Sequence, residues 1–237
     1  MSPLFSVLRP TLTIGRLVVN EVANLRQDIG VLTDVLHYPI KMLWGRMSKK
    51  DEIMDAAERA LRKDGYSDFN LLKIANEVGI QKSSLYHHFA SKSELVSSVF
   101  KRFSSQIFAF LDRTTQSEDR AGDRLLAYIL ESRELLNNGD SVCMSVVLNL
   151  NRGGLDSVIK NDLDLFHDTN IAWLKDTFEL GLRDGSIANI ANPATEATAS
   201  LSLIDGALLM AHAHQDLTLY DNSTALLRSR IRETVLS

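Results

Sequence analysis

One short segment, residues 81–92, has side chains of the types and spacing needed to contact nucleic acid. Leu85 and Phe89 lie four residues apart and share one face of a helix, so most other side chains of the segment point away from that face. Small hydroxyls, lysines, a tyrosine and histidines then face outward, where they can reach base edges and phosphate oxygens. The chemistry indicated is recognition of DNA.

Two preceding elements must position this segment. Apolar residues between 53 and 61 recur at intervals of three and four, which predicts a first helix over 49–63 that ends before Gly65. Asn70 is a good N-cap for a second helix that ends at Gly79, and a third, short helix is expected over 81–88. Two short helices around a glycine turn form a helix-turn-helix.

Residues 65–95, which include this segment, resemble the DNA-binding signature of the TetR family. The resemblance rests on Gly65-Tyr66-Ser67-Asp68-Phe69-Asn70, on Val78-Gly79-Ile80 and on the run from Ser84 to Leu95. It implies an all-α fold with two domains. An N-terminal three-helix DNA-binding domain is expected over 48–95, and a C-terminal helical ligand-binding and dimerisation domain over 96–237.

The resemblance also implies roles for individual residues. In the family, the positions matching Tyr86 and Lys92 hold phosphates, those matching 81–84 and His87 face the major groove, and Asn70 presents its backbone N–H to phosphate. Gln81 stands where the family usually has Ser or Thr, and Ser83 where it often has Gly or Ala, so both are expected to affect which sequence is preferred. The DNA-binding residues so implied are Asn70, Gln81, Lys82, Ser83, Ser84, Tyr86, His87, His88 and Lys92.

Net charge does not supply a global attraction to DNA. The chain of 237 residues has a formal charge of −4 and a pI of about 5.9. Residues 49–95 are balanced, with eight basic and eight acidic side chains, whereas 96–237 carry 13 basic against 19 acidic ones. Affinity for DNA must therefore come from a few placed contacts.

Long helices are expected in the part of the chain that follows the helix-turn-helix. Prolines occur only at 3, 10, 39 and 193, and apolar residues recur at helical spacing. The expected helices begin at Ser91 and then cover 119–137, 142–150, 156–183, 193–213 and 222–236. Residues 1–47 are interpreted as an N-terminal extension: either a translated leader upstream of a natural start at Met47, a mobile arm or an extra helix.

A cavity for a small-molecule effector is expected among the central helices, although aromatic stripes more often form plain core. Aromatic and apolar residues would line it, and His167, Asn149 or Asn170 would orient the ligand. The ligand-binding residues expected are Phe103, Phe110, Tyr128, Cys143, Met144, Phe166, His167, Asn170, Trp173 and Phe178.

Cys143, the one cysteine, excludes an intrachain disulfide and fits a reducing cytoplasm. It follows Asn138-Gly139-Asp140-Ser141-Val142, and this segment resembles the one in which some TetR-family members, including N-ethylmaleimide-responsive repressors, carry a reactive cysteine. The competing interpretation is a buried, apolar thiol in the core or the pocket. No basic neighbour in the sequence supports activation of the thiol.

A homodimer is expected from the last two helices. The stripe Ala197, Leu201, Ile204, Leu208, Ala211, together with residues of the last helix such as Leu226, Leu227, Ile231 and Val235, is predicted to pair across a two-fold axis. Pattern alone allows an intramolecular core face equally well, and the family resemblance favours the dimer.

Catalytic and metal sites are not indicated, and no cofactor is expected. His87 and His88 point about 100° apart on a helix, and His212 and His214 about 200°, so neither pair can share a metal. No apolar run reaches the length of a membrane span. The hypothesis is a cytoplasmic repressor that a small molecule releases from a pseudo-palindromic DNA operator. A cysteine-based redox or electrophile sensor, a non-repressing regulator of the same fold and a helical interaction protein without DNA binding remain the alternatives.

Overall fold

The structure is a computed structural model that describes residues 48–232. The expected extension over 1–47 and the end of the chain, Val235 included, lie outside the described residues.

One longer helix and two short ones form the N-terminal part of the described chain, as predicted. α2 (Lys49–Asp68) is interrupted at Gly65, where φ is 82°. α3 (Leu71–Glu77) starts at Asn70, whose side-chain oxygen accepts a hydrogen bond of 2.8 Å from the Leu72 amide. Gly79 turns the chain at a φ of 69°, which only glycine adopts without strain, and α4 (Lys82–His88) follows.

Buried apolar residues hold these helices together. These residues are Ile53 and Leu61 of α2, Ile74 of α3, Leu85 of α4 and Phe89 directly after α4, and all are at most 1% exposed. α3 packs on both α2 and α4. The helix-turn-helix arrangement is thus confirmed.

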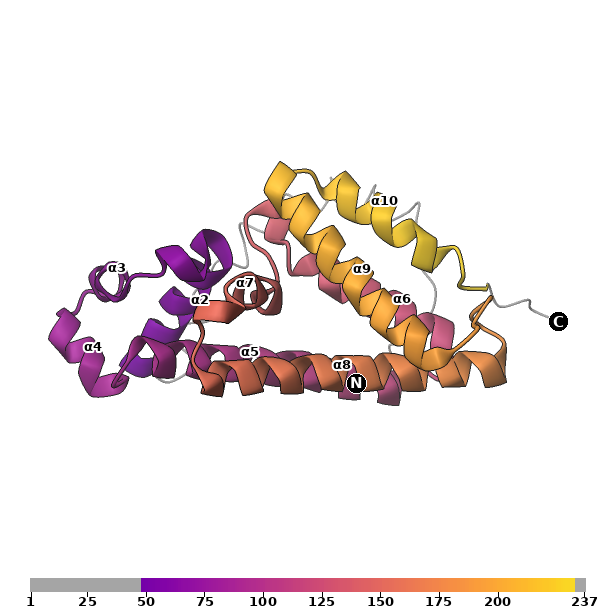
Figure 1. Ribbon diagram of the computed structural model, residues 1–237, viewed down its shortest axis with the longest axis horizontal. Coiled ribbons are helices and arrows are strands. Elements are labelled where there is room, and N and C mark those ends of the chain that lie inside the picture. The colour runs from indigo at the N-terminus through magenta and orange to yellow at the C-terminus, as the bar shows by residue number, and fades with distance from the viewer. Residues whose placement is uncertain (1–47, 233–237) are drawn as a thin grey trace, which may run out of the picture. The chain divides into compact units, whose positions relative to one another are not determined.

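The rest of the described chain is helical as well (Figure 1). Its helices are α5 (Lys92–Ser117), α6 (Ala121–Glu134), α7 (Met144–Leu150), α8 (Ser157–Asp184), α9 (Pro193–His214) and α10 (Leu217–Arg228), with the 3-10 turns η3 (Asn137–Gly139) and η4 (Arg152–Gly154). α5 runs beside α8, and α9 packs between α8 and α10. Within residues 48–232 no strand forms, only an isolated bridge between Ile187 and Ile231, so the all-α class is confirmed.

The start of α5 connects this part to the head, as we call residues 48–91 with α2, α3 and α4. Ser91 begins α5 by accepting a hydrogen bond from the Glu94 amide, and the Glu94 carboxylate accepts one from the Ala90 amide. α5 then continues without a break past residue 95, the expected domain boundary. Because α5 packs on α2 and also on α8, this one helix joins the head to the rest of the described chain, which we call the body.

The last described helix starts earlier than expected. The sequence predicted a helix from residue 222, but α10 begins at Leu217. Gln215 ends α9 in the left-handed conformation, with a φ of 54°, and the Asp216 side chain accepts a hydrogen bond from the Thr218 amide. A capping aspartate directly after a helix end thus starts the next helix at once.

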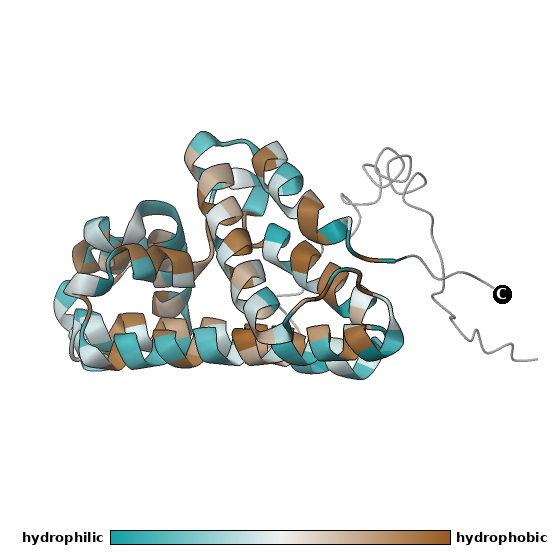
Figure 2. Cartoon of the chain, turned by 45° about the vertical axis from the view of Figure 1, so that its right-hand side comes forward, coloured by the Kyte–Doolittle hydropathy of each residue, from teal (hydrophilic) through white to brown (hydrophobic). Residues whose placement is uncertain are grey.

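The prediction that the apolar stripe of α9 faces a second subunit is wrong. Apolar residues lie both where the helices meet and at scattered exposed positions (Figure 2), and on α9 the stripe belongs to the buried ones. Because α9 packs against both α8 and α10, the stripe lies in the core of its own chain. Its residues are Ala197, Leu201, Ile204, Leu208 and Ala211, all at most 7% exposed.

No helix in the described part of the chain is long and apolar enough to cross a membrane.

Candidate nucleic-acid interface and internal cavity

α4 presents a polar surface to solvent. Leu85 is fully buried against the head, and this fixes the rotation of the helix. Lys82, Ser83 and His87 are then exposed, Tyr86 is 44% exposed, and the Lys82 ammonium lies 6.0 Å from the centre of the Tyr86 ring. The outward-facing set expected from the sequence is thus largely found at the surface, whereas Ser84 and His88 are half-buried.

The unusual residue Gln81 does not cap α4. Its side chain accepts no hydrogen bond from the backbone of the first turn, and the Ser83 hydroxyl lies 3.5 Å from its Oε1 atom. Asn70, by contrast, does cap α3. The amides at the start of α4 are therefore not occupied by the side chain of residue 81, and Gln81 itself is exposed.

Lys92 is half-buried at the base of the head. Its ammonium donates a hydrogen bond of 3.0 Å to the Tyr66 carbonyl and lies 4.1 Å from the centre of the Tyr66 ring. Burial lowers the pKa of Lys92 from its ordinary value. A phosphate contact by Lys92, as predicted, requires that the ammonium reach outward from this position, and it stays a prediction.

Ion pairs occupy several acidic residues of the head. Arg102 of α5 pairs with Asp55 at 2.7 Å and with Glu58 at 2.9 Å, and Glu77 pairs with Arg59 at 2.6 Å. By contrast, the exposed lysines Lys73 and Lys82 form no ion pair with any described residue. The balanced charge of the head thus leaves cations available on α3 and α4.

A cavity lies between α5, α6, α8 and α9. About 20 Å³ of it is open to the centre of a water molecule, enough for one water. Five residues expected to bind ligand line it: Phe110, Tyr128, Cys143, Phe166 and Asn170. The Tyr128 hydroxyl donates to Asn170 Oδ1 at 2.9 Å, and the Asn170 amide donates to the Phe166 carbonyl at 2.8 Å.

The other expected ligand residues lie in the surrounding core. Phe103 packs on Phe166 with ring centres 5.9 Å apart, and Trp173 stacks on Tyr128 at 5.6 Å. His167 lies 3.0 Å from Asn149, on the side of α8 that meets α7. Met144 and Phe178 are fully buried. A ligand role for all ten residues stays a prediction.

The cavity also contains two charged residues that were not predicted from the sequence, Asp205 and Glu131. Asp205 is the only charged residue between Glu196 and Asp216 in an otherwise apolar and small-residue helix. That isolation was the available signal, but it does not by itself tell an exposed position from an inward one. Several apolar lining residues were also missed: Ile107, Leu135, Leu201, Ile204 and Leu208.

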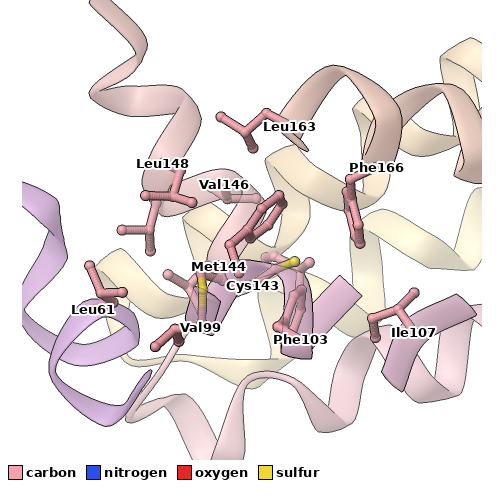
Figure 3. Close-up of a cluster of buried hydrophobic side chains, with 14 of the residues drawn as sticks. Leu61, Val99, Phe103, Ile107, Cys143, Met144, Val146, Leu148, Leu163 and Phe166 are labelled. Atoms are coloured by element: carbon pink, nitrogen blue, oxygen red, sulfur yellow. The ribbon is translucent and has the colours of Figure 1, made fainter. Parts of the chain in front are cut away.

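Cys143 is 4% exposed and lies among apolar side chains from α5, α7 and α8 (Figure 3). Its sulfur lies 3.0 Å from the Ser145 hydroxyl. Burial, and then the negative charge of Asp205, raise the pKa of the Cys143 thiol to about 11. A reactive cysteine needs a lowered pKa and access to solvent, so both properties favour the buried, apolar thiol.

Arg62 joins the head to the cavity wall. Its guanidinium donates to the carbonyls of Leu135 at 2.6 Å and Val142 at 3.2 Å, and its own carbonyl accepts from the Val142 amide. Leu135 and the neighbour of Val142, Cys143, line the cavity. One residue of α2 is thus bonded to two segments of the cavity wall.

Comparison with known proteins agrees with this architecture. Residues 53–99 match the family described as bacterial regulatory proteins, tetR family. The HTH-type transcriptional repressor KstR2 of Mycobacterium tuberculosis is 30% identical over 91 residues, which are 38% of this chain and 46% of that protein. The chain spans about half the length of the curated relatives it matches.

Solved structures share the fold over most of both chains. A TetR-family transcriptional regulator from Agrobacterium tumefaciens superposes with a TM-score of 0.73 at 24% identity, covering 78% of this chain and 98% of that one. Reduced NemR of Escherichia coli gives 0.68 at 23%, covering 80% and 100%. Fold and site together define a helix-turn-helix protein with a helical body. More narrowly, residues 53–99 match the DNA-binding domain of the tetR family of bacterial regulatory proteins, and the described chain has the fold of solved TetR-family structures.

Proposed function

We propose that this protein is a cytoplasmic, homodimeric transcriptional regulator that represses from a pseudo-palindromic DNA operator and is released by a small molecule. The observation that carries the proposal is the exposed polar face of α4, anchored by the buried Leu85, within the part that matches the TetR DNA-binding domain. Two such helices in a dimer would enter successive major grooves roughly 34 Å apart.

Each residue of the head has a distinct proposed task. Lys82, Ser83 and His87 are exposed on α4 and would read base edges, while Tyr86 would hold a phosphate. Gln81 and Ser83, at the start of α4, would set the sequence preference. Asn70 and Lys92 flank this surface and would contact the backbone of the DNA. Because the net charge is −4, these few contacts must supply the affinity.

The test is selection of a DNA site from a random library, followed by titration of that site in a fluorescence anisotropy assay. We expect Lys82→Ala to weaken binding about tenfold, and the double variant Lys82→Ala with Tyr86→Phe about a hundredfold, because each lost contact is worth roughly 1–2 kcal/mol. Lys175→Ala, an exposed lysine on α8, is the control and should bind as the wild type does. If the wild type selects no site, or Lys82→Ala with Tyr86→Phe retains full affinity, this proposal is wrong.

The dimer would form through the outer faces of α9 and α10. Met210 of α9 is 49% exposed and Leu226 of α10 is 64% exposed. Ser202 and Gly206 are exposed as well, and their spacing of four residues puts them on the same side of α9 as Met210. Apart from its chain neighbours and the nearby backbone of α9 itself, no described atom lies within 4 Å of the place a Cβ would take at Gly206. Small residues allow close helix approach, and exposed apolar ones gain from burial.

Light scattering after gel filtration tests this surface. Gly206→Arg and Leu226→Arg should each shift the dimer to the monomer, whereas Leu182→Arg, an exposed apolar residue on α8, should leave the dimer intact. A wild-type monomer, or a Gly206→Arg variant that stays dimeric, contradicts the proposed interface.

Release would act through the cavity. A ligand that enlarges it must move the segments around Leu135 and Cys143, and these are the segments that Arg62 bonds to the head. Displacement of the head by this route needs a coupling of roughly 1–3 kcal/mol, a common size for allosteric effects. The burial and raised pKa of Cys143 support a non-covalent ligand over an electrophile. A reporter gene behind the selected operator, silent with the wild type and active with Lys82→Ala plus Tyr86→Phe, tests repression itself.

A further inference from the structure

The cavity is negatively charged and holds no cation. Two carboxylates, Asp205 of α9 and Glu131 of α6, are among its lining residues, and no lysine, arginine or histidine is. The wall around them is apolar and partly aromatic, with Phe110 from α5, Tyr128 from α6 and Phe166 from α8. An acidic group in an aromatic surround is a combination that most core positions avoid.

Asp205 has no partner of its own among the described residues. No hydrogen bond and no ion pair connects its carboxylate to any of them. Other acids of the last helices are paired: Glu196 with Arg230 at 2.7 Å, and Asp221 with Arg133 at 2.7 Å. Burial raises the pKa of Asp205 to about 6, so near neutral pH the carboxylate is largely ionised and unpaired.

The neighbouring polar groups do not satisfy this charge. The Tyr128 hydroxyl donates its proton to Asn170, and the Asn170 amide donates to the Phe166 carbonyl. Asp205 is only partly buried, but burial still removes part of the hydration of its carboxylate, and without a donor or a cation among the described residues this loss costs stability. A positively charged ligand would supply the missing partner.

We infer that the effector is an organic cation, an amine or quaternary ammonium with an apolar body, whose positive group pairs with Asp205 in the cavity that Tyr128 and Phe166 also line. The inference rests on the proposed function and names the ligand class of the same cavity. Aromatic faces attract cations, and more strongly where water is excluded. An anion such as a fatty acid carboxylate would meet like charge from Asp205 and Glu131, and a neutral ligand would leave Asp205 unpaired.

The size of the cavity adds a mechanical consequence. With room for about one water, it must open before any organic cation fits. Leu135, which is only half-buried, lies in its wall, and the chain beyond it includes Asn137 and Asn138 with positive φ values of 43° and 58°. The Leu135 carbonyl is the atom that Arg62 holds from the head. Entry of the cation is thereby tied to the position of α2.

Isothermal titration calorimetry without DNA tests the inference. The probes are tetramethylammonium, benzyltrimethylammonium and tetraphenylphosphonium, with tetraphenylborate as the anion that has the shape of the last. We expect at least one cation to bind the wild type saturably and to bind Asp205→Asn at least about tenfold more weakly, as for the loss of one charge-assisted contact. Asp176→Asn, which removes an exposed carboxylate from α8, should bind as the wild type does.

The calorimetry can refute the ligand class independently of the proposed function. The inference is overturned if none of the three cations binds, if Asp205→Asn binds them as tightly as the wild type, or if tetraphenylborate binds more tightly than tetraphenylphosphonium. Asparagine has the shape of aspartate, and a cooperative thermal unfolding curve for Asp205→Asn confirms that this variant is folded. Because DNA is absent, a protein that binds a cation but no DNA site refutes the proposed function alone. A protein that binds DNA but no cation refutes the ligand class alone.

Discussion

The head and the cavity place their charged groups in opposite ways. Lys73 of α3 and Lys82 of α4 are exposed, so their charges have little effect on the stability of the fold. In the cavity, Asp205 is partly buried with no described partner. A surface site can therefore be added to a fold at almost no cost in stability, whereas an unpaired carboxylate in an internal cavity weakens the fold unless a ligand pairs with it.

Arg62 and Arg59 show the same contrast between an internal and a surface charge, since they lie on the same helix, α2, but face different surroundings. The Arg62 side chain is 18% exposed and bonded to two carbonyls of the cavity wall, whereas Arg59 is 64% exposed and paired only with Glu77. We expect Arg62→Met to lower the free energy of unfolding by roughly 3 kcal/mol, because two carbonyls and Glu58 lose a partner. Arg59→Met should change it by less than about 0.5 kcal/mol. Urea denaturation measures both.

If Arg62→Met and Arg59→Met lowered the free energy of unfolding equally, the contacts of Arg62 would not hold the head to the body. DNA titration adds a second reading. If Arg62 also transmits release, its variant should bind the selected DNA site in the absence of ligand but respond less to a bound cation.

The thiol of Cys143 gives the next largest expected effect. At a pKa of about 11, against an ordinary 9.0, the thiolate fraction near neutral pH is about a hundredfold lower. Only the thiolate attacks electrophiles, and the sulfur is buried besides. We expect Ellman's reagent to label the native protein at least about a hundredfold more slowly than the unfolded protein in urea. Rapid labelling of the native protein, with loss of DNA binding that Cys143→Ser prevents, would restore the electrophile sensor.

Asp205 predicts how stability depends on pH. Its pKa is about 6 in the folded chain against an ordinary 3.8, so between these values the folded state binds more protons than the unfolded state. The free energy of unfolding should therefore fall as the pH rises from about 4 to 6, by about 2 kcal/mol and at most about 3. Asp205→Asn should lack this fall and be more stable than the wild type at about pH 7.

Other groups at the cavity set the controls for this measurement. Tyr128 and Cys143 have pKa values raised far above this range and stay neutral throughout. Glu131 is the remaining carboxyl, and Glu131→Gln on its own should retain the fall in stability. A wild type and an Asp205→Asn variant with the same pH profile would contradict the burial of an ionised Asp205.

Most of the head could be predicted from the sequence, because its signals are local. Asn70, Gly79 and Ser91 act through neighbours within a few residues, and each was found where it was expected. The cavity could be predicted only in outline. Its walls come from residues 107 to 208, and helical spacing does not tell which neighbour a face packs on. The stripe on α9 was misassigned for that reason, since a core face and a dimer face have the same pattern.

The smallest expected effect concerns the start of α4. Gln81 makes no side-chain cap, so Gln81→Ser should supply one and raise the free energy of unfolding by about 0.5–1 kcal/mol, whereas Gln81→Ala should not. Urea denaturation measures the stability, and anisotropy with the selected DNA site measures the affinity. If Gln81 serves recognition, as we propose, the more stable Gln81→Ser variant should discriminate less well between the selected site and sites altered at single base pairs. If Gln81→Ser is more stable but discriminates between DNA sites as the wild type does, the proposed role of Gln81 in recognition is wrong. Gln81 would then lower the stability of the head without a role in binding.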